Sequence, residues 1–195
     1  MIRRLLALIA TFGLFGAVTP SSATVLLYDT NLSGLNEVPA NASPASGTST
    51  ISFDTVTQML SVNLVYSGLV SPATAAHIHC CVAAGSNVAV AVSLLGFVTG
   101  ATSGSYNQLF DLTDPSVFSA GFLSANGGTA AGAEAALLSA FDNSLAYVNV
   151  HTSVFPGGEI RGQVAPTQAP VPEPATLALL GLGMAGLGLS RRRRA

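Results

Sequence analysis

Lysine and tryptophan are absent from this 195-residue chain, and charged residues of any kind make up only 8% of it. Of its seven basic residues, all arginines, two lie near the start and four near the end, so Arg161 is the only basic side chain between Thr24 and Pro170. Such a charge balance excludes nucleic acid as a partner and disfavours anionic lipid, which leaves neutral or cationic partners. One basic residue against eight acidic ones gives this region a net charge of −7, the acidic residues being Asp29, Glu37, Asp54, Asp111, Asp114, Glu134, Asp142 and Glu159.

The sequence also lacks the motifs of common enzyme classes. It contains no Gly-x-Ser-x-Gly elbow, no glycine-rich nucleotide loop and no carboxylate pair in a recognisable motif. We therefore expect a non-catalytic protein.

The first 23 residues have the three parts of a secretory signal peptide. Arg3 and Arg4 supply the positive start, and Leu5 to Val18 forms an apolar run that is short for a membrane span. Small residues end the segment at Ala23, where we expect signal peptidase to cleave.

The last 24 residues, 172–195, form a second targeting segment. A proline-rich linker over 166–171 precedes a Pro-Glu-Pro triplet, then an apolar stretch from Ala175 to Leu189 and four terminal arginines. This tail resembles the PEP-CTERM sorting signal, which implies an exosortase as processing partner and export in a Gram-negative bacterium that makes exopolysaccharide. A permanent C-terminal membrane anchor is the alternative to a transient one. The sorting residues are Pro172, Glu173, Pro174, Arg191, Arg192, Arg193 and Arg194.

Between these targeting segments, residues 24–165 alternate apolar and polar side chains. Leu60, Val62 and Leu64 alternate with Ser61 and Asn63, a period typical of half-buried antiparallel strands. The pattern predicts an all-β sandwich with one helical excursion late in the chain, flanked by N- and C-terminal hydrophobic targeting helices. The expected helices begin at the caps Asp114 and Thr129. We expect these core residues: Ile51, Phe53, Leu60, Val62, Leu64, Ile78, Val148, Val150 and Ile160.

Three segments carry a family resemblance that spans nearly all of 32–164. They read LSGLNEVPA from Leu32, AAHIH from Ala75, and AYVNVHTSVFPGGEIRGQV from Ala146. Together they resemble the CHRD domain, the module named from chordin. The resemblance implies an immunoglobulin-like sandwich in a secreted protein. The first and last motifs also suggest that Arg161 ties its strand to Glu37, the alternative being a surface pair with Glu159.

All three histidines of the chain fall in these motifs. On a strand, His77 and His79 project from one face, where two imidazoles can reach one metal ion. His151 could supply a third if its strand is a neighbour. The order of these residues resembles that of the Greek-key Cu/Zn superoxide dismutases, although their zinc-loop ligands have no counterpart here. The candidate cofactor is therefore copper or zinc, and the alternative is a hydrogen-bonded polar cluster without metal.

Two adjacent cysteines, Cys80 and Cys81, follow the histidine pair in place of the Gly-Pro-like turn of many CHRD domains. Export favours oxidation. A disulfide between neighbours, two free thiols, and a Cys81 that joins the histidines all remain open from the sequence.

Two functions follow from these observations. The first is an exported, non-catalytic CHRD-domain protein of the cell envelope or exopolysaccharide matrix, anchored in the membrane before processing and released to the surface or matrix afterwards. The alternative is a secreted copper- or zinc-binding β-sandwich protein with a three-histidine site.

Overall fold

The computed structural model of the protein describes residues 24–167. The signal segment, the sorting segment and the hydrophobic targeting helices expected there lie outside the described residues. The elements in chain order are β1 (Val25–Ser33), η1 (Gly34–Asn36), β2 (Ser46–Asp54), β3 (Met59–Ser67), β4 (Ala73–Cys80), β5 (Val90–Ser93), β6 (Gly104–Asp111), η2 (Pro115–Val117), α1 (Ala120–Ala125), α2 (Ala130–Asp142), β7 (Ala146–Thr152), β8 (Ile160–Gln163) and β9 (Ala165–Pro166).

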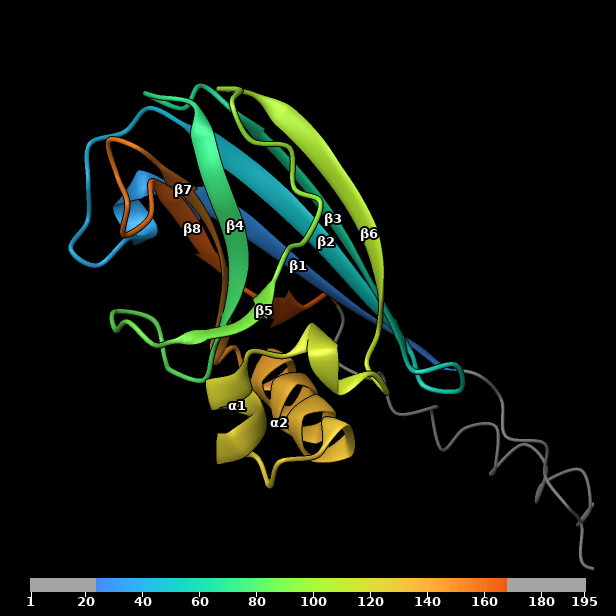
Figure 1. Ribbon diagram of the computed structural model, residues 1–195. Helices are drawn as coiled ribbons and strands as arrows, with labels where there is room; N and C mark the ends of the chain where they lie inside the picture. The colour runs from blue at the N-terminus through green and yellow to red at the C-terminus, as the bar shows by residue number, and fades with distance from the viewer. Residues whose placement is uncertain (1–23, 168–195) are drawn as a thin grey trace, which may run out of the picture.

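The strands form one antiparallel sheet that curls into a half-barrel, with both helices at one end (Figure 1). Eight strands follow the order β5-β4-β7-β8-β1-β2-β3-β6, and β9 pairs with β1. The predicted antiparallel β architecture is confirmed, but the two separate sheets of a sandwich are not found. The reason lies in β1, which pairs with β2 along one edge and with β8 and β9 along the other. Strand β1 therefore joins what would be two layers.

The hydrophobic core fills the concave side of this sheet. All nine residues predicted for it are at most 2% exposed. Helix α2 closes one end of the core, where the ring of Phe141 packs 5.1 Å from that of Tyr28 between centroids. The Tyr28 hydroxyl donates to Asp142 over 2.9 Å, so the last residue of α2 is also tied to β1.

The helical segment lies where the sequence predicts it, but its first α-helix begins at a later residue than expected. Thr129 caps α2 as expected, its side chain accepting from the Gly132 amide. Asp114 caps only the short η2, and the chain is extended again at Phe118 before Ser119 caps α1. This break follows from pairing, because Phe118 forms a bridge with Val92 of β5 and cannot also be helical.

Among residues 24–167, no helix is long and apolar enough to cross a membrane.

Candidate functional site

One side of β4, β7 and β8 is polar and faces away from the hydrophobic core. Alternation turns Ile78, Val148 and Ile160 to the core and their neighbours to the other side. Cross-strand register then aligns the neighbours in rows, for example His77 with Asn149 and Asn149 with Arg161. We call this set the polar face: His77 and His79 of β4, Tyr147, Asn149 and His151 of β7, and Arg161 and Gln163 of β8.

Two loops, 34–45 and 81–89, cover the polar face. The Asn36 amide donates to the Arg161 carbonyl over 3.1 Å, which holds the first loop on β8. The Asn87 amide donates to the Val38 carbonyl over 2.7 Å, which joins the second loop to the first. As a result every residue of β7 is buried, including those of the polar face.

The three histidines meet within this covered region. His77 Nδ1 lies 3.0 Å from His151 Nε2. One nitrogen from each of His77, His79 and His151 lies within 4.8 Å of the other two. Strand pairing explains the meeting, because β4 and β7 are neighbours in the sheet. The structure thus brings together all three histidines, as their strand positions predict.

Backbone carbonyls fix the tautomers of two of these rings. His79 Nδ1 lies 2.8 Å from the Val88 carbonyl, and His151 Nδ1 lies 3.0 Å from the Pro156 carbonyl. A carbonyl oxygen only accepts, so both Nδ1 atoms carry the proton and both Nε2 atoms present a lone pair. His151 Nε2 accepts from His77, whereas His79 Nε2 is buried without a hydrogen-bond partner among the described residues. Metal-binding histidines usually have this arrangement, in which the second nitrogen donates to a carbonyl or carboxylate.

The environment keeps the three imidazoles neutral. Burial, with smaller effects of the nearby His151 and His79 rings, lowers the pKa of His77 to about 4. Burial also lowers the pKa of His79 and of His151, although the bonds to Val88 and Pro156 act in the opposite direction. At neutral pH all three rings are therefore in the unprotonated state that coordinates metal ions.

An aromatic ring and the single cation of the described region support His79. The Tyr147 ring stacks on the His79 imidazole with centroids 4.8 Å apart and planes inclined by 3°. The Arg161 guanidinium lies 4.3 Å from the centroid of the same Tyr147 ring. Arg161 is held by the Asn36 carbonyl at 2.7 Å and the Asn87 side chain at 2.9 Å. It thus connects β8 to the first motif through Asn36 rather than through a hydrogen bond to Glu37.

Two buried carboxylates hold loop 34–45 in place. Glu159 accepts from the Ser43 hydroxyl, the Val70 amide and the Thr152 hydroxyl, at 2.7, 2.6 and 2.8 Å. Glu37 accepts from the Asn149 amide over 3.0 Å. Burial raises the pKa of Glu37 to about 7, against the opposing effects of Arg161 and Asn149. Both carboxylates are engaged within the protein.

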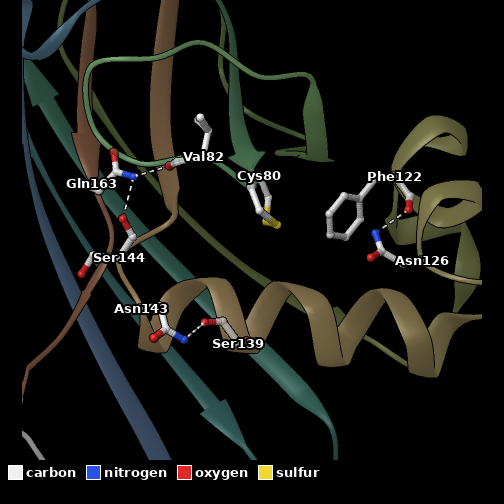
Figure 2. Close-up of a disulfide and its surroundings, with 9 residues drawn as sticks. Cys80, Val82, Phe122, Asn126, Ser139, Asn143, Ser144 and Gln163 are labelled. Atoms are coloured by element: carbon white, nitrogen blue, oxygen red, sulfur yellow. Dashed lines mark hydrogen bonds between the residues drawn. A yellow bond between two sulfur atoms is a disulfide. The ribbon is translucent and has the colours of Figure 1, made fainter.

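The cysteines lie just beyond the histidines but do not join them. Cys80 and Cys81 are linked by a disulfide across a cis peptide bond. Figure 2 shows the disulfide at the end of β4, where Cys80 belongs to the buried hydrophobic core. Cys81 is therefore not a ligand of the histidine cluster, and the vicinal disulfide is the alternative that the structure contains.

The sequence left part of this site unassigned. Val88 and Pro156 act through their carbonyl groups, which no side-chain pattern reveals. Asn149 follows the strand parity of Tyr147 and His151, so alternation predicts its face but not its hydrogen bond to Glu37. The sorting residues Pro172 to Pro174 and Arg191 to Arg194 lie outside the described residues.

Comparison with known families gives two matches. A model described as the CHRD domain matches residues 28–164, and a model described as the PEP-CTERM protein-sorting motif matches residues 170–194. The first match contains the whole polar face. No curated protein and no solved structure matches the chain.

Proposed function

The chain belongs to the CHRD family, and on that premise we propose that it is an exported, non-catalytic envelope protein that binds copper or zinc. Its PEP-CTERM motif implies export, processing by an exosortase and sorting to the cell surface. The finer location that we propose is the cell envelope or the exopolysaccharide matrix, reached after signal peptidase has removed residues 1–23.

The orphaned Nε2 atom of His79 carries the metal proposal. A buried polar atom without a partner is costly in a protein interior. Here the bond from Nδ1 to Val88 keeps that lone pair unprotonated, and His151 Nε2 is prepared in the same way. A divalent or monovalent metal ion would accept both lone pairs at once.

The spacing of the nitrogens supports the proposal. Two nitrogen ligands of one tetrahedral ion, with metal–nitrogen bonds of about 2.1 Å, are about 3.4 Å apart. The three nitrogens lie within 4.8 Å of one another, so a contraction of about 1.4 Å or less brings them to that spacing. His77 is the ligand free to make that adjustment, because its ring has no backbone anchor and is only half-buried. On binding, its Nδ1 proton would leave the His151 bond and move to Nε2.

We propose binding rather than catalysis because the two buried carboxylates bonded to β7 are already engaged. A general base must be free to receive a proton from a substrate. Glu159 is hydrogen-bonded three times, and Glu37 is bonded to Asn149.

Metal titration of the purified full-length protein tests the proposal. We expect saturable binding of one Zn²⁺ or Cu²⁺ per chain. His79→Gln retains a donor for the Val88 carbonyl but removes the imidazole, and should weaken binding by about 100-fold or more. Asn107→Gln on the exposed face of β6 is the matched control and should bind as the wild type does.

Circular dichroism of each metal-free variant shows whether the fold persists. Absence of binding by the wild type, or equal binding by a folded His79→Gln variant, would contradict the metal site. Either result would favour the second candidate, an envelope or matrix module whose histidines form only a hydrogen-bonded cluster. The 3.0 Å bond between His77 and His151 is the observation that favours this second candidate.

A further inference from the structure

A pocket of about 320 Å³ opens between the two covering loops, beside the polar face. Its volume is near the lower end of the range for ligand pockets, about 300 to 1,000 Å³, which suits one small cyclic unit. Residues from both loops and from β8 line it, among them Leu35, Glu37, Val38, Ala84, Arg161 and Gln163.

A hydrogen-bond donor of Arg161 lines this pocket. Arg161 is 2% exposed and uses its Nε and Nη1 atoms on Asn36 and Asn87. Its Nη2 group has no hydrogen-bond partner among residues 24–167. Two neighbouring residues hold the guanidinium in one orientation, so the remaining donors are fixed in place.

A hydrogen-bond acceptor stands two residues farther along the same strand. The Gln163 amide nitrogen donates to the carbonyls of Val82 and Ser144, over 3.0 and 2.8 Å (Figure 2). These two bonds fix which end of the amide is which, and Oε1 has no partner among the described residues. Residues two apart on a strand share a face, so the Arg161 donor and the Gln163 acceptor face the same space.

A hydroxyl group matches this pair because it accepts one hydrogen bond and donates another. Charge favours a neutral ligand over an acidic one. Glu37 lines the pocket together with Arg161, which offsets the positive charge, and the surrounding domain is strongly acidic. Leu35, which is 79% exposed, and Val38 also line the pocket and offer apolar surface to C–H groups.

We propose that this pocket binds a neutral glycosyl residue, with its hydroxyl groups on Arg161 and Gln163 and its C–H face on Leu35. The metal proposal is independent of this one, because none of the three histidines lines the pocket. A domain that binds one glycosyl unit of a polysaccharide could be retained in an extracellular matrix after its release from the membrane.

Saturation-transfer NMR on the purified full-length protein tests this inference. The probes are four neutral disaccharides, maltose, cellobiose, lactose and mannobiose, with digalacturonate as the acidic comparison. We expect saturable transfer to at least one neutral probe, and weaker transfer to digalacturonate. Ala84→Trp places a large side chain at the exposed pocket wall and should weaken binding by about tenfold or more. Leu109→Trp, at a 55% exposed position on β6, is the matched control and should leave binding unchanged.

Three results would overturn the inference. They are no saturable transfer to any of the four neutral probes, tighter binding of digalacturonate, and an equal effect of Ala84→Trp and Leu109→Trp. A failure here leaves metal binding unaffected, since the zinc titration of the wild type reads the histidine cluster separately.

Discussion

Glu159 offers the sharpest test of how loop 34–45 is joined to the sheet. Its carboxylate is fully buried and accepts three hydrogen bonds, from Ser43, Val70 and Thr152. Replacing it with alanine leaves three donors without an acceptor, and each unsatisfied donor destabilises the fold by about 1–3 kcal/mol. Water that enters the site recovers part of this free energy. We therefore expect Glu159→Ala to lower the free energy of unfolding by about 3–5 kcal/mol. Since domains are stable by only about 5–15 kcal/mol, this change removes a large fraction of the total.

Urea denaturation followed by circular dichroism measures the effect as a lower midpoint at an unchanged slope. A loss of 3–5 kcal/mol corresponds to a fall in melting temperature of roughly 6–20 °C for a domain of this size. Glu159→Gln retains the side-chain volume and one acceptor oxygen, so it should lower the free energy of unfolding by about half as much as Glu159→Ala does.

Removal of any carboxylate also relieves repulsion in so acidic a domain, and Asp29→Ala controls for this. Asp29 is exposed on β1, and its replacement should change stability by less than about 0.5 kcal/mol. If Glu159→Ala lowered the free energy of unfolding by less than about 1 kcal/mol more than Asp29→Ala does, the three hydrogen bonds would not stabilise the fold, which would refute the reasoning.

Three further predictions concern pH, backbone packing and processing. The pKa of Glu37 is raised from 4.5 to about 7, so its contribution to stability is full below pH 4.5 and is lost as pH rises through 7. The urea midpoint of the wild type relative to that of Glu37→Gln should therefore decrease between pH 4.5 and 8, and a constant difference would contradict this. Gly162→Ala places a methyl group against Thr30 and the Asn31 backbone and should destabilise by about 1–3 kcal/mol. Gly121→Ala in α1 meets open space and should be neutral or stabilising in the same thermal melts. Intact-mass spectrometry of protein from the native host should show a start at Thr24 and loss of Arg191–Arg194, and a mature species with all four arginines would contradict processing at the PEP-CTERM motif.

Local alternation predicted most of the fold, because it reports which side of a strand meets the core. Residues such as Ile78, Val148 and Ile160 are buried where the pattern places them. Alternation does not report which strands pair, so the continuity of the sheet through β1 could not be read from it. For the same reason the sequence does not reveal that Phe118, which follows the expected helix start at Asp114, is extended and pairs with β5.

The candidate site shows the same division between local and distant information. Strand parity predicts that His77 and His79 lie on one face of β4. His151 joins them only because β7 is the neighbour of β4, which parity does not predict. That β7 is buried on both sides depends on the covering loops, which lie far away in the sequence. The pairing of Cys80 with Cys81 depends on local backbone geometry that residue types do not determine.

The loop 81–89 has a consequence for how this protein can change in evolution. Surface loops usually tolerate insertions and deletions, because few contacts depend on their length. This loop is fixed near its start, where Val82 bonds to Leu145, and near its end, where Asn87 bonds to Arg161 and Val88 to His79. Inserting one residue between Val82 and Asn87 would displace the acceptors of Arg161 and His79 together, whereas substitutions at the exposed Ala83 and Ala84 would leave them in place. Relatives of this chain that preserve the histidine geometry should therefore vary in composition along this loop while conserving its length.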